Sequence, residues 1–213
     1  MQKANLLQKM KQQNFELAEQ WAIPVNDEVW LVPIGTWMLS HNQYVEEMAT
    51  WRFASRNSFF ARFPFSYESF NAYLVSHAIN DQSNLTFAIM RNKSELLGHL
   101  GLSSVVSDEA TIDAVMIRPS TRSSGLARMA LQTLINWSAQ TLSVRHFTLE
   151  VLSSNEGAIR LYSRLGFEIS SRYHLRQVGK GEATTMEECM LEESNVEELK
   201  FVMSLKLTDS PVT

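Results

Sequence analysis

The stretch Arg122–Ala127, RSSGLA, joins a strand-like run to a helical pattern and could bind an anion. The first amides of a helix have no partner within the helix, and the peptide dipoles add a partial positive charge there. Gly125 would let the backbone approach a ligand closely, and Arg122 could bind phosphate oxygens through two donors. Ser123 and Ser124 could donate hydroxyls or cap the helix. A plain helix start with serine caps explains the same six residues, so the hexamer alone leaves both interpretations open.

A second stretch with chemical potential covers residues 149–168, LEVLSSNEGAIRLYSRLGFE. Asn155 is placed to cap the start of a short helix, and Gly166 follows its end. Tyr162 lies within that helix and carries a phenol, while Glu150 places a carboxylate on the strand before it. The hexamer RSSGLA lacks the Gly-Lys-Ser/Thr of a Walker A loop and two of the three glycines of a Rossmann fingerprint.

The elements that must position these residues can be predicted from hydrophobic periodicity. Strands are expected at 28–35, 84–91, 95–105, 110–118, 145–152, 167–176 and 184–192, and helices at 41–54, 66–79, about 124–140 and 155–166. Three consecutive strands form an antiparallel meander, and helical crossovers follow. The expected class is α+β, with a mixed, mostly antiparallel sheet of about seven strands flanked by about four helices.

Taken together and in this order, the two stretches resemble the GCN5-related N-acetyltransferase (GNAT) superfamily, over residues 28–192. RSSGLA fits its Arg/Gln-x-x-Gly-x-Gly/Ala loop, and LEV…N…AIRLYSRLGF is similar to the second half of its cofactor site. The resemblance implies the three-layer GNAT fold, with two central strands splayed apart to admit acetyl-CoA. It implies an acetyltransferase domain at 27–192, an amphipathic N-terminal extension at 1–26 and a C-terminal extension at 193–213.

The resemblance also implies roles for individual residues. The pyrophosphate of acetyl-CoA would lie on the amides of Arg122, Ser123, Ser124, Gly125, Leu126 and Ala127. The pantetheine arm would pair with the backbone of Val115, Met116 and Ile117, and Asn155 would contact it. Tyr162 would lie near the thioester sulfur and donate a proton to the leaving thiolate. The tetrahedral intermediate would be stabilised by a backbone amide of the splayed strand. Packing beside Leu161 is the alternative for Tyr162.

The residue that removes a proton from the acceptor amine is not determined by the sequence. Asp113 lies on the strand that leads to the loop, where a carboxylate needs a partner if it is buried. Glu150 occupies a position similar to the catalytic glutamate of some ribosomal-protein acetyltransferases. His99 and His146 rank lower, because a lone strand histidine is more often structural. Proton loss through ordered water is a further alternative.

The acceptor would be bound by the region of residues 41–77, which is rich in aromatic and basic side chains. The aromatic residues are Trp51, Phe53, Phe59, Phe60, Phe63, Phe65, Tyr67, Phe70 and Tyr73, and the basic ones are His41, Arg52, Arg56, Arg62 and His77. Most of the aromatic residues are expected in the core. The pattern is nevertheless similar to acetyltransferases of amino-sugar and nucleotide-sugar pathways, although Ala114 stands where that subgroup has a polar residue.

The predicted activity is therefore transfer of an acetyl group to a primary amine of a small molecule, such as an amino sugar or a nucleotide-linked amino sugar. A ribosomal-protein or protein N-terminal acetyltransferase would share Glu150 and Tyr162 but would need an open groove for a peptide. A non-catalytic module that binds acetyl-CoA is the third interpretation, and the presence of Tyr162 places it last.

Composition limits the other partners. The formal net charge of −4 over 213 residues disfavours a nucleic-acid or anionic-membrane surface. With one cysteine, Cys189, an intrachain disulfide cannot form, which is compatible with a cytoplasmic location. The first residues lack the apolar core of a secretion signal, and no stretch reaches the length of a membrane span. No metal is expected, and a homodimer is left open.

Overall fold

The computed structural model describes residues 2–62, 66–122, 124–181, 183–190 and 198–208. One ten-stranded sheet has the order β1-β2-β4-β5-β6-β7-β10-β8-β9-β3. The strands are β1 (Ile23–Pro24), β2 (Val29–Pro33), β3 (Ala61–Arg62), β4 (Leu85–Arg91), β5 (Glu95–Val106), β6 (Glu109–Ile117), β7 (His146–Leu152), β8 (Glu168–Lys180), β9 (Ala183–Cys189) and β10 (Glu198–Lys206). All neighbours pair antiparallel except β6 and β7, as expected for the α+β class.

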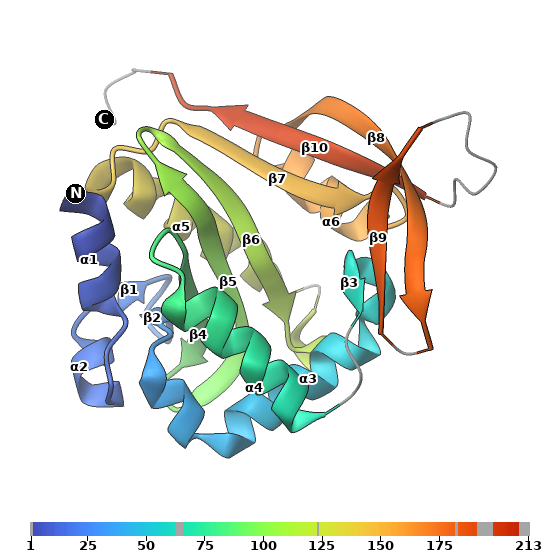
Figure 1. Ribbon diagram of the computed structural model, residues 1–213. Coiled ribbons are helices and arrows are strands. Elements are labelled where there is room, and N and C mark those ends of the chain that lie inside the picture. The colour runs from blue at the N-terminus through green and yellow to red at the C-terminus, as the bar shows by residue number, and fades with distance from the viewer. Residues whose placement is uncertain (1, 63–65, 123, 182, 191–197, 209–213) are drawn as a thin grey trace.

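Helices cover both faces of the sheet (Figure 1). They are α1 (Gln2–Met10), α2 (Phe15–Glu19), α3 (Asn42–Ala54), α4 (Tyr67–Tyr73), α5 (Leu126–Thr141) and α6 (Glu156–Ser163), with short 3-10 turns at Thr36–Ser40, Arg56–Ser58 and Pro119–Thr121. The helix predicted at 66–79 changes character midway, since a π-helix, Leu74–Asn80, continues α4. None of the helices in the described ranges is long and apolar enough to cross a membrane.

Two apolar clusters hold the layers together, one on each face of the sheet. Alternate residues of β4 enter different clusters: Phe87 packs with α5, whereas Ala88 packs with α3 and α4. This alternation follows from the two-residue period of a strand, and burial of both faces explains why β4 reads as a nearly continuous apolar run. The sheet is therefore the middle of three layers.

Strands β6 and β7 pair at one end and then separate. Three residue pairs join them, from Glu109↔His146 to Thr111↔Thr148, and beyond Thr111 the strands diverge (Figure 1). On its other side β6 stays paired with β5 as far as Ile117. The gap is the splay that the resemblance implies, and it divides the sheet into two halves.

Both chain ends contribute to this one folded unit. Leu7 and Met10 of α1 are buried in the cluster that includes α5. At the other end β10 lies between β7 and β8 and pairs with both along its length. Parts of the predicted extensions at 1–26 and 193–213 thus pack into the sheet and its core. The sheet of the described residues has ten strands, more than the seven or so expected.

Candidate active site

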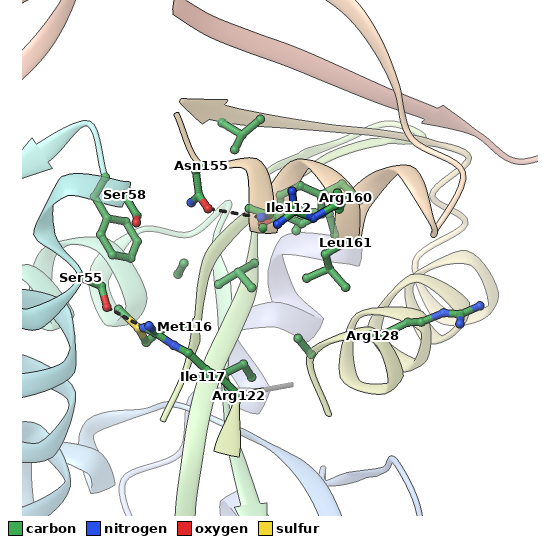
Figure 2. Close-up of a pocket in the computed structure, with 18 of the residues that line it drawn as sticks. Ser55, Ser58, Ile112, Met116, Ile117, Arg122, Arg128, Asn155, Arg160 and Leu161 are labelled. Atoms are coloured by element: carbon green, nitrogen blue, oxygen red, sulfur yellow. Dashed lines mark hydrogen bonds between the residues drawn. The ribbon is translucent and has the colours of Figure 1, made fainter. Parts of the chain in front are cut away.

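A cavity of about 710 Å³ occupies the gap between β6 and β7. Its size is in the range of small-molecule sites. The lining residues come from β6, the loop after it, the start of α5, the end of β7, α6 and the segment after α3: Ser55, Ser58, Phe59, Phe60, Ile112, Asp113, Ala114, Val115, Met116, Ile117, Thr121, Arg122, Gly125, Leu126, Ala127, Arg128, Glu150, Val151, Asn155, Gly157, Ala158, Arg160, Leu161, Tyr162 and Arg164. Figure 2 shows β6 and α6 on facing sides of this space.

The backbone of β6 presents hydrogen-bonding groups to the cavity. The Arg118 amide donates to the carbonyl of Leu97 on β5. Successive amides of a strand point to opposite sides, so those of Ile117 and Val115 are directed toward the gap. Because β7 has already diverged, no described strand pairs with this edge there. It offers the kind of ladder that an extended amide-containing ligand can complete.

The loop at the start of α5 has the conformation of an anion site. Gly125 is the N-cap with φ of 81°, a left-handed value that favours glycine. Among the described residues, and apart from its chain neighbours and the backbone of α5, no atom lies within 4 Å of where its Cβ would be. Glycine is therefore favoured here by the backbone conformation and not by lack of space. The first backbone hydrogen bond of α5 is donated by the Met129 amide to the Gly125 carbonyl. The amides of Ala127 and Arg128 therefore precede the regular hydrogen bonds of the helix.

Arg122 and Ser124 of the loop make different hydrogen bonds. The Arg122 guanidinium donates to the Ser55 hydroxyl at 2.6 Å, across the cavity from the loop (Figure 2). The Ser124 hydroxyl donates to the Thr121 carbonyl at 2.8 Å, so Ser124 shapes the loop and does not line the cavity. Ser123 lies outside the described residues.

Three arginines of the cavity, Arg128, Arg160 and Arg164, were not singled out from the sequence. Arg128 comes from α5, Arg160 from α6 and Arg164 from the C-cap of α6, and with Arg122 they give the lining four basic residues. Figure 2 shows the Arg128 side chain extending away from the cavity. Arg160 also pairs with Glu156 one helical turn away, at 2.9 Å. Helical spacing on α6, where Arg160 and Arg164 are four residues apart, was the signal that could have found two of them.

A β-bulge shapes β6 at the middle of the cavity. Gly101 pairs with Asp113 and His99 with Met116, so one residue of β5 faces two of β6. Ala114 occupies the bulge with φ of 53°, an uncommon value for a residue with a Cβ. The bulge re-aims the strand where Asp113 enters the cavity.

Asp113 is held by two hydrogen bonds. Its Oδ2 lies 2.9 Å from Nε2 of His77, and its Oδ1 accepts from the Ala114 amide at 2.6 Å. Burial alone would raise the pKa of Asp113, but these bonds and the positive charge of Arg52 outweigh it and hold the pKa below its ordinary value. Asp113 is therefore an anion at neutral pH.

Tyr162 lines the cavity from α6 and is buried, with 8% of its surface exposed. Its ring packs edge-on against Phe167, with centroids 6.1 Å apart. Burial and the negative charge of Asp113 raise the pKa of Tyr162, which keeps the phenol protonated at neutral pH. Tyr162 therefore packs against its neighbours and also carries a protonated phenol that lines the cavity.

Residues 45–167 match the family model of the acetyltransferase (GNAT) family. The chain belongs to this family. It is 38% identical over 88 residues to the [ribosomal protein bS18]-alanine N-acetyltransferase of Salmonella typhimurium, a match that covers 40% of this chain and 59% of that enzyme's length.

Solved structures agree on the fold. A probable GNAT acetyltransferase from Chromobacterium violaceum has a TM-score of 0.68 and 18% identity, covering 87% of this chain and 85% of its own. A spermidine N-acetyltransferase from Vibrio cholerae, solved with CoA and spermine, has a TM-score of 0.62 and 16% identity, covering 85% and 96%. At these identities the likeness concerns the GNAT fold alone.

Within the GNAT fold, Asn155 caps α6 as its position in the sequence predicts. Its Oδ1 accepts from the Ala158 amide at 3.3 Å, and the residue lines the cavity (Figure 2). Since the carbonyl oxygen of the side chain serves the cap, the amide nitrogen is the group that can face a ligand.

The other predicted carboxylate, Glu150, has a different environment. Lys200 of β10 donates to Glu150 at 2.7 Å and to Glu188 of β9 at 2.6 Å. Burial alone would lower the pKa of Lys200, but the two carboxylates outweigh it and raise the pKa. Glu150 lines the cavity with its carboxylate bound in an ion pair, whereas Asp113 is bound by a histidine.

The two histidines that the sequence offers as candidate bases, His99 and His146, are not among the residues that line the cavity. His99 is 3% exposed, and its ring lies near the Ala114 backbone without a hydrogen bond of good geometry in the described part of the chain. Burial lowers the pKa of His99 to about 4. His146 pairs with Asp108 at 3.5 Å, where β6 and β7 are still joined.

The part of the cavity that the sequence predicts to bind the acceptor is bounded by the segment between α3 and α4. The Arg52 guanidinium lies 3.3 Å from the Phe59 ring centroid, a cation–π contact. Phe60 packs on Leu152, Leu175 and Met186, and β3 pairs with β9. The segment thus ties α3 to the far half of the split sheet. Phe63 and Phe65 lie outside the described residues, and Trp51 and Phe70 are buried in the core.

Within the described ranges, no group of three or more histidine, cysteine, aspartate or glutamate side chains could hold a metal ion.

Proposed function

We propose that this protein is an acetyl-CoA-dependent N-acetyltransferase that transfers the acetyl group to a primary amine. The observation that carries the proposal is a single cavity with an anion-binding loop at one end and Asp113 and Tyr162 in its lining. Membership of the GNAT family supports the donor, and the placement of the two titratable groups supports the transfer.

The donor half is assigned to the loop and the β6 edge. The amides of Ala127 and Arg128, with Gly125 and the arginines of the cavity, would hold the diphosphate of acetyl-CoA. The Val115 carbonyl and the Ile117 amide would pair with the amide-containing arm, and Asn155 would donate to it from the start of α6. All of these groups belong to one continuous lining, so a single extended ligand can reach them.

The acceptor half is assigned to Asp113 and its surroundings. A primary amine arrives as an ammonium ion, and the Asp113 carboxylate offers it an opposite charge inside the cavity. One proton must leave before attack on the thioester carbonyl and a second as the amide forms. Because the pKa of Asp113 is lowered, this carboxylate binds the ammonium ion better than it retains a proton, and water carries the protons onward.

Tyr162 is assigned the role of acid toward the leaving thiolate. Its raised pKa keeps the phenol protonated at neutral pH, so Tyr162 can donate a hydrogen bond to the thiolate as it forms. Because a thiol is a stronger acid than this phenol, the proton that the thiol finally carries is replaced on Tyr162 by one of the two protons that the amine releases. A backbone amide of the bulged strand would stabilise the oxyanion of the tetrahedral intermediate. The Ala114 amide is engaged by Asp113, so Val115 is the next amide along the strand that can serve.

For the acceptor we favour a slender amine on a small molecule. The segment Phe59–Arg62 follows α3 and pairs through β3 with β9, so it crosses beside the cavity. Such a crossing favours an amine that enters the cavity end-on. A protein N-terminal α-amine is the second candidate, and the alanine N-acetyltransferase from Salmonella supports it by relationship. A peptide would have to insert its first residue past the same segment.

The test is release of the CoA thiol from acetyl-CoA in the presence of different amines. The panel contains spermidine, a free amino sugar, a nucleotide-linked amino sugar and peptides that begin with alanine or serine. Turnover with one class, together with a product heavier by one acetyl group, identifies the acceptor. Tight acetyl-CoA binding without turnover in the whole panel would favour the non-catalytic module instead.

A further inference from the structure

His77 lies at the centre of a hydrogen-bonded chain that ends in the cavity. It is carried by the π-helix Leu74–Asn80, a rare element that is frequent at functional sites. Its Nε2 lies 2.9 Å from Asp113 Oδ2, and its ring stacks on Tyr73 with centroids 5.1 Å apart and an interplanar angle of 15°. These two contacts fix both the position and the plane of the imidazole.

The opposite side of the ring faces a buried amide. Asn84, which is 4% exposed, places Nδ2 3.0 Å from the His77 carbonyl and 3.4 Å from His77 Nδ1. The Asn84 Oδ1 accepts from the Ser104 amide at 3.3 Å, so the amide group has its oxygen turned away from the ring. Nδ1 therefore faces a donor, and the proton of a neutral imidazole belongs on Nε2, directed at Asp113.

The end of the π-helix is anchored by the N-terminal part of the chain. The Lys11 ammonium donates to the Ile79 carbonyl at 3.3 Å and to the Asp81 carbonyl. A Cβ on Gly35 would lie 2.2 Å from the Gln12 carbonyl oxygen, so the residues around Lys11 approach the β2 end closely. The element that carries His77 is thus held from outside the segment that matches the family model, residues 45–167.

We propose that His77 is a positioning residue that donates through Nε2 to Asp113 and holds its carboxylate, as an anion, toward the acceptor amine. The proposal rests on the proposed function, because it assigns Asp113 to the acceptor side. It differs from a general-base role for His77: the imidazole gives a hydrogen bond and takes no proton from the amine. Asn84 selects the tautomer that makes this bond.

Two neutral substitutions separate the roles. In His77→Gln the side-chain Nε2 can occupy the place of the imidazole Nε2 and still donate to Asp113. In His77→Asn the shorter amide reaches only the place of Nδ1, beside Asn84, and the bond to Asp113 is lost. For His77→Asn we expect kcat/KM for the amine to fall about 10- to 100-fold, the effect of a lost hydrogen bond to a charged group, with KM for acetyl-CoA unchanged. His77→Gln should restore most of that loss.

Equal losses in both variants would overturn the donor role and leave His77 as a base or a packing residue. Full activity in both would overturn the proposal as well. A measurement without turnover separates this proposal from the proposed function. Two-dimensional ¹⁵N–¹H spectra of the intact chain should show His77 protonated on Nε2, with its nitrogen shifts displaced in Asp113→Asn. A wild-type His77 protonated on Nδ1 refutes the inference even if no acceptor amine is found.

Discussion

His99 should make the stability of the fold depend on pH. In the unfolded chain its pKa is about 6.5, and burial lowers the folded value to about 4. Above about pH 6.5 both states hold a neutral imidazole and stability is unaffected. As pH falls from about 6.5 to about 4, the unfolded chain binds a proton that the folded chain excludes, so stability falls. The full difference corresponds to about 3 kcal/mol.

The perturbation is His99→Leu, which replaces a ring without a hydrogen bond of good geometry in the described residues by an apolar group. Near neutral pH we expect stability equal to wild type within about 1 kcal/mol, or higher, because the polar contact that is lost, to the Ala114 backbone, is weak. Urea unfolding at about pH 8 and about pH 4.5 should show that the wild type loses about 2 to 3 kcal/mol more than the variant.

The free energy of unfolding of the variant must be subtracted from that of the wild type at each pH, because some carboxyl groups also titrate in this range. The pKa values of Asp81, Asp113 and Glu198 are lowered, so these groups reduce stability as pH falls below their ordinary range. They are present in both proteins and cancel. A wild-type minus variant difference that stays constant with pH would refute the argument and mean that folded His99 accepts a proton near its ordinary pKa. Acetyl transfer by the variant would also remove His99 from the candidate bases.

Three further expectations concern the cavity. Gly125→Glu should abolish acetyl-CoA binding measured by calorimetry, because the new side chain strains a left-handed backbone and brings a negative charge to the anion loop. Gly125→Ala adds only the strain, so it should bind acetyl-CoA more tightly than Gly125→Glu does. Tyr162→Phe should lower kcat about 10²- to 10⁴-fold with little change in acetyl-CoA affinity, and an unchanged kcat would leave Tyr162 as packing only. Asp113→Asn should lower kcat/KM for the amine about 10- to 100-fold, whereas Glu150→Gln should stay near wild type. The reverse order would assign the acceptor contact to Glu150.

Much of the fold could be predicted because its signals are local. The apolar runs of β4 and β5, the cap at Asn155 and the glycine before α5 each depend on neighbours within a few positions. The anion loop is of this kind, because a helix start and a left-handed glycine are properties of consecutive residues. Family resemblance then linked the loop to the second stretch, and both line one cavity.

Other features arise between distant segments and have no local signal. Strand β10 belongs to the predicted C-terminal extension, whose sequence suggests a short helix or strand and a loose tail. It becomes an interior strand because β7 and β8 each leave an edge that it can pair with. The same insertion brings Lys200 to Glu150, fifty positions away in the chain, and binds one of two carboxylates that looked equivalent in sequence.

The other carboxylate meets His77 across thirty-six positions, through a π-helix whose sequence reads as the end of an ordinary helix. By itself the sequence determined the elements, the anion loop and the candidate groups, because hydrophobic period and capping act over a few residues. Tertiary structure decided which charge each candidate faces, because electrostatic environment depends on atoms within a few ångströms in space wherever they lie in the chain.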